Sequence, residues 1–302
     1  MTRASATLIG LLAIVMWSTL ALFTAASGKV PPLQLVAMCL LVGGLLGMTR
    51  WPGHPGRIAL AFGQSGAVYA LGCAGLFGFH LFYFTALRHA PVIEASLISY
   101  LWPMLIVLFS ALLPGERLGW HHLIGAALGL AGAVLIVTGG KAIAFRIEYL
   151  TGYLAALGAA LSWSSYSVLS RRFAHVGVDV ITVFCLASAA LAAIAHLLLE
   201  TTLWPQGPGQ WLAVLGLGLG PVGGAFYVWD TGMKHGDIQF LGVSAYAAPL
   251  VSTLLLIVAG YAAFTWVVAL AVVAMTVGAL IAARDILLGH ARMKSPRQTG
   301  TG

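Results

Sequence analysis

The amino-acid sequence predicts an all-α polytopic membrane protein with ten transmembrane helices, arranged as two inverted five-helix repeats. Three observations support this prediction: the composition, a series of apolar segments of membrane-spanning length, and an internal repeat. Of the 302 residues, 60% are hydrophobic and only 8% are charged, and the mean hydropathy is +0.98. Soluble domains carry about 25% charged residues. The composition therefore excludes an ordinary soluble enzyme and predicts a chain built into a bilayer.

The net charge and the cysteines exclude two further classes of protein. The formal charge is +7, but the basic residues fall in loops and in the C-terminal tail, without the patch interleaved with aromatic residues that marks nucleic-acid binding. Cys39, Cys73 and Cys185 lie within apolar runs and show no CxxC or Cys/His metal spacing. We expect them to be buried free thiols, and we expect no metal and no cofactor.

Ten apolar segments follow one another, each near the roughly 20 residues that cross a bilayer. They lie near residues 7–25, 32–50, 65–87, 91–112, 119–138, 149–170, 178–199, 209–233, 238–258 and 264–283. Gly- and Pro-rich joints separate them. The first segment, with Arg3 before it and Ala25-Ala26-Ser27 after it, also fits a signal peptide. The repeat described below predicts that it is retained.

The distribution of Lys and Arg predicts how the chain is oriented. If the N-terminus is cytoplasmic, only Lys29, Arg88, Lys141 and Arg146 of the 15 basic residues face outside. Cytoplasmic loops of membrane proteins carry an excess of basic residues. We therefore expect both ends of the chain in the cytoplasm, with a disordered basic tail over residues 288–302.

The internal repeat appears when the chain is compared with itself at a shift of 146 residues. Without a gap, this shift matches Trp17-Ser18 to Trp163-Ser164, Cys39 to Cys185, Tyr100 to Tyr246, Pro103 to Pro249, and Trp120 to Trp266. The two halves, residues 1–140 and 147–287, then hold five spans each. Because five is odd, the second half enters the membrane from the opposite side. This inverted plan is typical of secondary transporters, whose site lies at the midplane and whose halves exchange conformations in alternating access.

Large rings at matching depth suggest a substrate site. Trp17, Tyr100, Trp163 and Tyr246 each lie about 10–14 Å from the nearer end of a span, towards the middle of a roughly 30 Å core. We expect these four rings to form an aromatic cage. Aromatic faces bind flat ligands and hold ammonium groups. The alternative is that the two tryptophans only pack at a helix crossing.

Two prolines are expected to interrupt their helices beside this cage. Pro103 and Pro249 lack an amide hydrogen, so each frees a carbonyl one turn back. A freed carbonyl inside the bilayer needs a partner from protein or water. Together with Ser244, such a carbonyl is a candidate ligand for an amino group. Trp102 points to a different helix face from Tyr100, so it lines the same cavity only if the Pro103 kink opens the helix.

Further candidates come from other spans. His80 and Tyr83 lie on one face of the third span with Phe79 beside them, and an ionisable residue inside a membrane is by default a functional hypothesis. Tyr166 belongs to the polar run Ser162–Ser167, whose serines also suit close helix packing. Asp230 and Lys234 are spaced for an i,i+4 ion pair, with a proton site as the alternative. Glu94 and Arg88 are expected to form a surface pair.

Two stretches carry a resemblance to a known family. The runs MTRASATLIGLLAIVMWST (Met1–Thr19) and IEASLISYLWPMLIVLFS (Ile93–Ser110) resemble the YddG-type aromatic amino-acid exporters. These belong to the drug/metabolite transporter superfamily, whose EamA-type members carry two five-helix repeats. The resemblance implies a multi-pass exporter of the bacterial inner membrane with a central cavity. It implies aromatic and some other neutral amino acids, such as threonine and methionine, as substrates.

The leading hypothesis is therefore a secondary transporter or facilitator for amino acids, embedded in lipid as a monomer or weak dimer. A carrier for other small amphipathic solutes is the alternative. An intramembrane enzyme would need a nucleophile, base and acid at one depth, but Cys73 lies about 10 Å along the helix from His80. A channel would want a continuous polar pore. A sugar-nucleotide carrier would want Lys or Arg inside its cavity, whereas the basic residues here fall at span ends.

Overall fold

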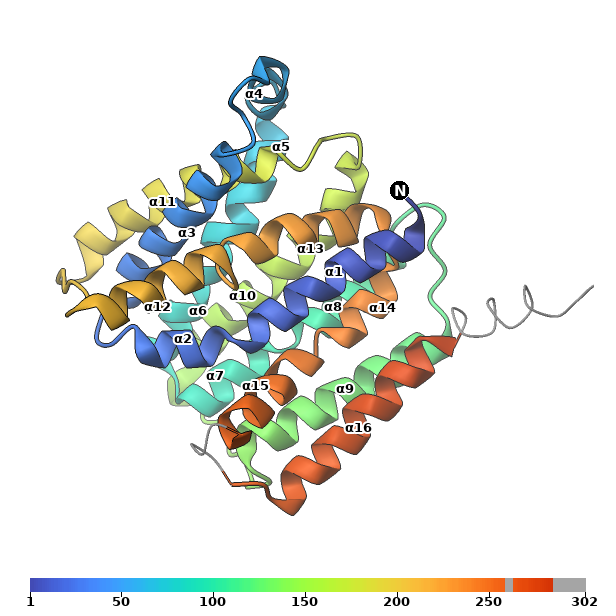
Figure 1. The fold of residues 1–302 in the computed structure, drawn as a ribbon. Coiled ribbons are helices and arrows are strands. Elements are labelled where there is room, and N and C mark those ends of the chain that lie inside the picture. Colours follow the sequence, from blue (N-terminus) through green and yellow to red (C-terminus); the bar gives the residue numbers. More distant parts are fainter. Residues whose placement is uncertain (259–262, 285–302) are drawn as a thin grey trace, which may run out of the picture.

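Each predicted apolar segment begins and ends within a few residues of one helix or of two helices joined end to end. The structure is a computed structural model that describes residues 1–258 and 263–284, and its regular structure within them is entirely helical (Figure 1). The α-helices are α1 (Arg3–Ser18), α2 (Leu20–Ala26), α3 (Pro32–Met48), α4 (Pro55–Phe62), α5 (Gly66–Cys73), α6 (Phe79–His89), α7 (Val92–Ser99), α8 (Trp102–Ser110), α9 (Trp120–Thr138), α10 (Leu150–Leu169), α11 (Val180–Leu199), α12 (Pro208–Leu219), α13 (Gly224–His235), α14 (Ile238–Ser244), α15 (Ala247–Val258) and α16 (Trp266–Ala282). A π-helical turn, η1 (Ala74–Gly78), and two 3₁₀ turns, η2 (Ile147–Tyr149) and η3 (Ser170–Phe173), complete the order.

Seven helical segments of the described chain are long and apolar enough to cross a membrane. They are Arg3–Ala26, Gly66–His89, Val92–Ser110, Trp120–Thr138, Val180–Leu199, Pro208–His235 and Ile238–Val258. Helices α3 and α16 are apolar but shorter, with 17 residues each. Helix α10 has 20 residues and carries the polar run 162–167. The protein is thus a multi-pass membrane protein, and the predicted tail over residues 288–302 lies outside the described residues.

Two helices are interrupted at matching positions in the two halves. The segment Val92–Ser110 breaks between α7 and α8, just before Pro103, and the segment Ile238–Val258 breaks between α14 and α15, just before Pro249. In both, the proline falls within the first three residues of the second helix, where a missing amide hydrogen costs least. The breaks lie where the two prolines predict kinks.

A second pair of interruptions also matches. The third segment passes through the π turn η1, and the eighth breaks at residues 220–223, between α12 and α13. These positions are 146 residues apart. The break in the second half contains Pro221, whose carbonyl accepts a hydrogen bond from Trp17 Nε1 at 3.1 Å. At the matching turn η1 in the first half, the Ala74 carbonyl accepts a hydrogen bond from the Ser162 hydroxyl of α10. Neighbouring helices therefore satisfy the carbonyls that these irregular turns leave open.

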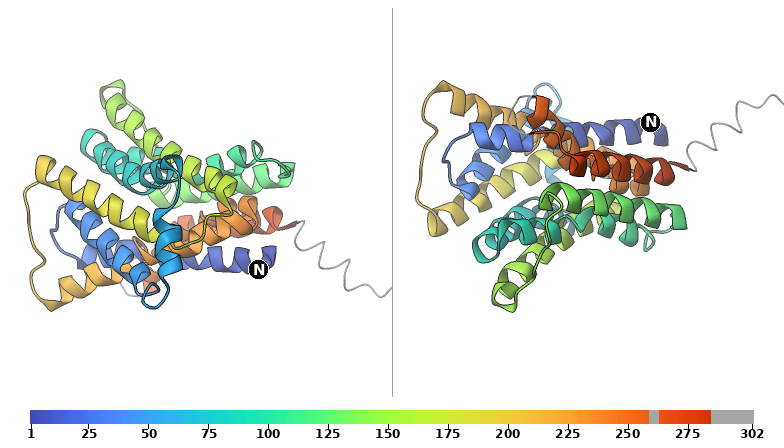
Figure 2. Two further views of the ribbon diagram at one scale, coloured as in Figure 1. Left: turned by 90° about the horizontal axis from the view of Figure 1, so that it is seen from above. Right: turned by 90° about the horizontal axis from the view of Figure 1, so that it is seen from below.

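The helix contacts repeat between the two halves. Helix α1 packs along α13, and its counterpart α10 packs along α6; α3 packs along α11, and α9 along α16. Glycine allows the first contact to be close, because a Cβ on Gly232 would lie 2.6 Å from the Cα of Gly10. At the corresponding positions of the α6–α10 contact stand Ala86 and Ala156, both fully buried in one cluster. Figure 2 shows the result, with the cyan to light-green helices α6 to α10 as one layer against the blue and the yellow-to-red helices.

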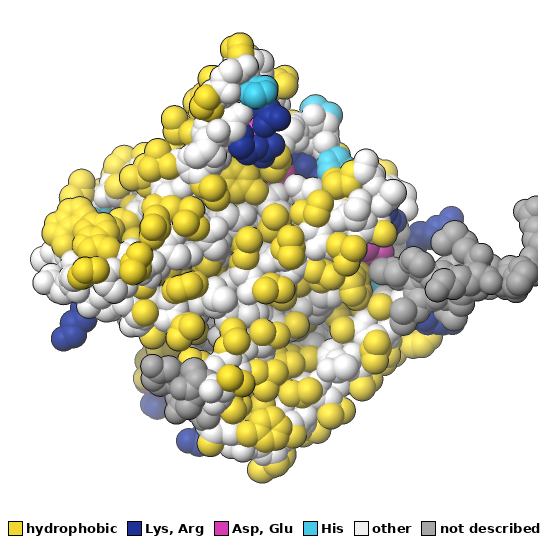
Figure 3. Space-filling view, in the orientation of Figure 1, with side chains coloured by type: hydrophobic (Ala, Val, Ile, Leu, Met, Phe, Trp, Pro, Cys, Tyr) yellow, Lys and Arg dark blue, Asp and Glu magenta, His cyan; other side chains and the backbone are white. Residues whose placement is uncertain are grey.

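Charged side chains gather at the two ends of the bundle, and apolar ones cover the face between them (Figure 3). One end, which we name the Arg3 end, holds Arg3, Glu116, Arg171 and Asp237. Arg284 lies over the Trp120 ring at this same end. Helix α1 therefore begins, and helix α16 ends, at the Arg3 end. The opposite end, which we name the Glu200 end, holds Glu200, Arg88 and His196.

Candidate functional site

Four tryptophan rings meet where the two layers of helices face each other. Trp17 of α1 lies 4.8 Å from Trp229 of α13, 5.8 Å from Trp102 of α8 and 5.9 Å from Trp163 of α10, measured between ring centroids. The other three rings lie 5.9–6.4 Å from one another. Most of these contacts are edge-to-face, the arrangement that aromatic quadrupoles favour. We call Trp17, Trp102, Trp163 and Trp229 the tryptophan cluster.

Residues that match in the repeat touch each other at this cluster. Trp17 and Trp163 are 146 residues apart, and their rings are in contact. His80 and Phe226 are also 146 residues apart, and their ring centroids lie 6.5 Å apart. Two equivalent residues can meet in this way only near the axis that relates the two halves. The tryptophan cluster therefore lies close to such an axis.

The third span brings a second group of rings to the cluster. Phe79 stacks on Tyr83 at 5.9 Å and lies 6.0 Å from Trp163. His80 Nδ1 lies 2.6 Å from the carbonyl oxygen of Leu76. Because a carbonyl only accepts, the proton sits on Nδ1 and the neutral ring keeps Nε2 as an acceptor. The Tyr83 hydroxyl is 3.5 Å from Ser96 Oγ. Phe79, His80 and Tyr83 are all half-buried.

The predicted four-ring cage is only partly assembled in the structure. Trp17 and Trp163 lie together, and Tyr100 is half-buried at the α7–α8 break. Tyr246 instead lies with α9 in a separate cluster, where its hydroxyl accepts a hydrogen bond from the Met104 amide at 3.2 Å. The interrupted helix leaves that amide without an intrahelical partner, which explains where Tyr246 goes. Trp102 and Trp229 occupy the remaining places beside Trp17.

Sequence reasoning missed Trp229 and Phe226. The repeat holds the signal that would have found them, since the shift of 146 residues matches Tyr83 to Trp229 and His80 to Phe226. Trp229 is fully buried and its Nε1 donates to Ser167 Oγ at 3.0 Å. Ser244 is buried at the end of α14. Ser99, before the matching break, is buried with an Oγ that has no hydrogen-bond partner among the described residues.

A buried ion pair lies next to the tryptophan cluster on the side of the Arg3 end. Lys234 Nζ is 2.8 Å from Asp230 Oδ2, and it donates to the Val176 carbonyl at 3.0 Å. The Tyr166 hydroxyl donates to Asp230 Oδ1 at 3.3 Å, and the Tyr166 ring lies 5.3 Å from Trp163. The pair thus links α13 to α10 and to the loop before α11. Such a pair is held in place by its partners rather than by water.

Further ion pairs join the helices at the Arg3 end. Glu116 binds Arg171 at 2.8 Å and Arg3 at 3.2 Å, and Arg3 also reaches Asp237 at 3.3 Å. Arg171 donates to two backbone carbonyls at the C-terminal end of α13, those of Met233 and Gly236. Burial lowers the pKa of the Arg171 guanidinium from its ordinary value, and the Glu116 carboxylate acts in the opposite direction. Arg171 thereby ties η3, the α8–α9 loop and the end of α13 together.

The Glu200 end is joined differently. Glu200 accepts hydrogen bonds from Arg88 at 2.7 Å and from the Leu33 and Gln34 amides at the start of α3. His196 Nδ1 lies 3.0 Å from the same carboxylate. The expected pair between Arg88 and Glu94 is wrong, because Arg88 reaches across to Glu200, 112 residues away. Arg88 thus pairs with the buried carboxylate of Glu200, which also binds the start of α3, and not with Glu94, its neighbour in the sequence.

Known proteins resemble this chain along most of its length. The model of the EamA-like transporter family matches residues 4–138 and again residues 150–284. A protein of Ancylobacter novellus named "Aromatic amino acid exporter YddG" is 53% identical over 285 residues, 93% of this chain and 98% of the relative. Proteins of the same name from Salmonella typhimurium and Escherichia coli are 30% and 28% identical, each over 84% of this chain and 88% of the relative.

A solved crystal structure is similar in fold as well. It superposes with a TM-score of 0.89 at 51% sequence identity and covers 97% of this chain and 100% of its own. At this level of identity the arrangement of helices is shared throughout.

Proposed function

The chain belongs to the EamA-like transporter family, and from that premise we propose that it exports aromatic and other neutral amino acids. It is a multi-pass protein of the bacterial inner membrane. The observation that carries the proposal is the tryptophan cluster, where rings from both layers meet beside His80. The 53% identical relative is named for export of aromatic amino acids. Since these three relatives are named as exporters, we favour a carrier over an enzyme.

We propose that the two halves, residues 1–140 and 147–287, are inverted five-helix repeats with both ends of the chain in the cytoplasm. Several observations support this. The family matches the chain twice, the helix contacts repeat between the halves, and Trp17 lies against its own counterpart Trp163. The ten-span count follows if α3, α10 and α16 also cross the membrane. Because the cluster is assembled within one chain, transport needs no second copy, and a monomer or weak dimer suffices.

Alternating access is the proposed mechanism, with the Arg3 end closed and the Glu200 end open in this conformation. Helix α13, near the Arg3 end, buries eight of its residues, whereas the matching helix α6 buries only Ala86. Phe79, His80, Tyr83 and Tyr100 remain half-buried at mid-depth. Polar rings at that depth are expected to face a watery cavity rather than lipid. If α13 took up the loose packing of α6, and α6 the close packing of α13, the Arg3 end would open and the Glu200 end would close.

Each candidate residue has a physical role in this mechanism. The rings of Trp163, Trp102 and Trp17 offer faces and edges to an aromatic side chain. The free Ser99 hydroxyl and the break before Pro103 offer oxygen ligands to an ammonium group. A protonated His80 would donate Nε2–H to a carboxylate. Asp230 and Lys234 are assigned to holding α13 on α10, since each already has a partner.

The test is transport by the purified chain in liposomes. Vesicles that contain the protein should release trapped phenylalanine or tryptophan faster than empty vesicles do. Trp163→Ala should reduce the flux about ten-fold or more, because it removes a wall of the site, while the variant still inserts. Release at the rate of empty vesicles would overturn the carrier assignment. An unchanged flux in Trp163→Ala would remove that residue from the site. An imposed proton gradient then tells coupled transport from facilitated diffusion.

A further inference from the structure

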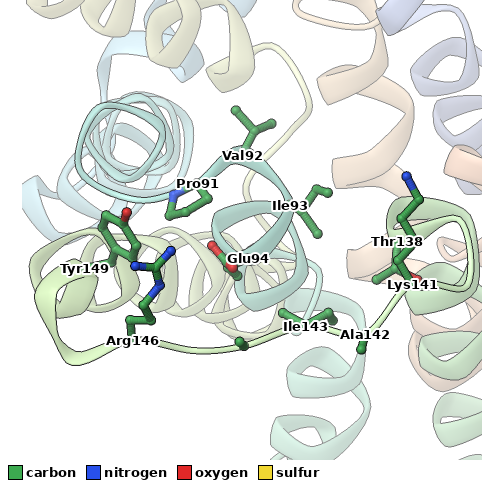
Figure 4. A pocket seen from close by; sticks show the side chains of 11 residues that line it. Pro91, Val92, Ile93, Glu94, Thr138, Lys141, Ala142, Ile143, Arg146 and Tyr149 are labelled. Atoms are coloured by element: carbon green, nitrogen blue, oxygen red, sulfur yellow. The ribbon is translucent and has the colours of Figure 1, made fainter.

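A cavity of about 410 Å³ opens at the Glu200 end, between the first turn of α7 and the linker from α9 to α10 (Figure 4). Its walls are apolar along Pro91–Ile93 and Ala142–Ala144. The ionisable groups that line it are Glu94 on α7 and Lys141, Arg146 and Tyr149 on the linker. Its volume falls in the range of small-molecule sites. None of the residues that line the cavity belongs to the tryptophan cluster, so the two are separate.

Glu94 lines this cavity and carries an unused acceptor beside it. Its Oε2 is buried and has no hydrogen-bond partner among the described residues, and Arg88, the nearest base in the sequence, is engaged by Glu200. A buried carboxylate oxygen without a partner is costly. Figure 4 shows the Glu94 carboxylate in the middle of the lining residues, with Arg146 and Tyr149 to one side of it. A primary ammonium group supplies what this oxygen lacks.

Arg146 presents the opposite charge from the linker. Its guanidinium pairs with Glu148 at 3.0 Å and lies over the Tyr149 ring, 5.7 Å from the ring centroid. The Arg146–Glu148 pair is more than half exposed on both sides, and exposed pairs of this kind are weak. Arg146 can therefore exchange Glu148 for a ligand anion. Arg146 and Glu94 both line the cavity, and no ion pair joins them within the described chain.

We propose that this cavity binds a zwitterion that carries a primary amine, with its ammonium group on Glu94 and its anionic group on Arg146. A free amino acid has this chemistry, and so has the headgroup of phosphatidylethanolamine. The apolar side chains of Val92 and Ile93 border the cavity and are exposed, as contact with a lipid would require. The inference depends on the cavity alone and not on the direction or energetics of transport.

The experiment uses the full chain in nanodiscs of phosphatidylcholine, which has no primary amine, with photo-methionine as a cross-linkable amino acid. Labelling of residues 91–94 and 138–149 is mapped by mass spectrometry. Glu94→Gln should lower it about ten-fold, and Arg146→Gln several-fold, because each removes one charge-assisted contact. Lys29→Gln, a loss of an exposed base at the same end outside the cavity, should leave it unchanged. Glu148→Gln should preserve or raise it, because it frees Arg146.

The lipid source is tested in nanodiscs that contain phosphatidylethanolamine, by native mass spectrometry of the lipids that remain bound. Loss of retained phosphatidylethanolamine in Glu94→Gln supports the zwitterion site with a lipid occupant. Equal labelling and equal lipid retention in the wild type and Glu94→Gln would overturn the proposal. Labelling of peptides around Trp163 verifies that the variants are folded. If the liposome assay showed no flux while residues 138–149 were still labelled, the export function would be overturned and the cavity proposal would stand.

Discussion

Helices α6 and α13 stand at matching positions of the two halves, but their surroundings differ. Helix α13 buries most of its side chains against α1, α10 and η3, and α6 leaves most of its side chains half-exposed. The matched contacts differ in the same sense, with Gly10 against Gly232 between α1 and α13 and Ala156 near Ala86 between α10 and α6. Two related five-helix units thus hold two packings at once, and the closer one lies toward the Arg3 end.

The largest expected difference concerns two basic residues that match in the repeat, Lys234 and Arg88. Lys234→Met strands a buried Asp230 and should cost about 3–5 kcal/mol of stability. Arg88→Met should cost about 1 kcal/mol or less, because the Arg88 side chain is 43% exposed and Glu200 keeps His196 and two amides.

Unfolding in detergent, followed by tryptophan fluorescence, measures both losses. The double variant Asp230→Asn with Lys234→Met removes the stranded charge and should regain part of the stability. Equal losses for Lys234→Met and Arg88→Met would contradict the proposed difference between the two ends.

A methyl group at the closest helix contact should have the next largest effect. In Gly232→Ala the new Cβ would lie 2.6 Å from the Gly10 Cα, so α1 and α13 must separate, at a cost of about 1–3 kcal/mol. Gly56→Ala is the matched control, since its Cβ would meet nothing within 4 Å. Melting temperatures of the two variants decide the matter. A Gly232→Ala protein as stable as the control would mean that the close contact is not needed.

The Arg3 end should loosen when its shared carboxylate is lost. Glu116→Gln removes the negative charge that Arg3 and Arg171 share, and it should favour opening of this end by about ten-fold. Ser170, buried nearby in η3, serves as the reporter when replaced by cysteine. A maleimide should then modify Ser170→Cys about ten times faster in the Glu116→Gln background, and at an unchanged rate with Glu200→Gln. Equal rates in both backgrounds would rule out this network as the closure.

The smallest effect is expected from Tyr246→Phe. It removes one hydrogen bond, to the Met104 amide, and should cost about 0.5–1.5 kcal/mol of stability with little change in liposome flux. Trp229→Phe, within the tryptophan cluster, should lower the flux clearly while keeping an aromatic ring in place. If Tyr246→Phe reduced the flux as strongly as Trp229→Phe did, the separation of Tyr246 from the cluster would lose its functional meaning.

The helices and their breaks were predictable because they depend on local properties. Apolar runs of membrane length define the segments, and Pro103 and Pro249 have no amide to donate. The contents of the tryptophan cluster were less predictable. The expected depth of Tyr246 made it a candidate for the cage, but its hydroxyl binds the Met104 amide, 142 residues away, and its ring packs in a cluster with α9. Trp229 was overlooked although the repeat marks it, and the π turn that orients His80 depends on packing against α10.

The central claim is that the rings beside the tryptophan cluster, such as Tyr83, can be reached from the Glu200 end, whereas the fully buried Trp229 is sealed off, above all from the Arg3 end. Single cysteines at the matched positions Tyr83 and Trp229 test it, in a background without Cys39, Cys73 and Cys185. A membrane-impermeant maleimide is applied to sealed vesicles of either orientation. We expect Tyr83→Cys to be modified from the outside and Trp229→Cys to resist modification from both sides. Faster modification of Trp229→Cys from the cytoplasmic side would contradict it.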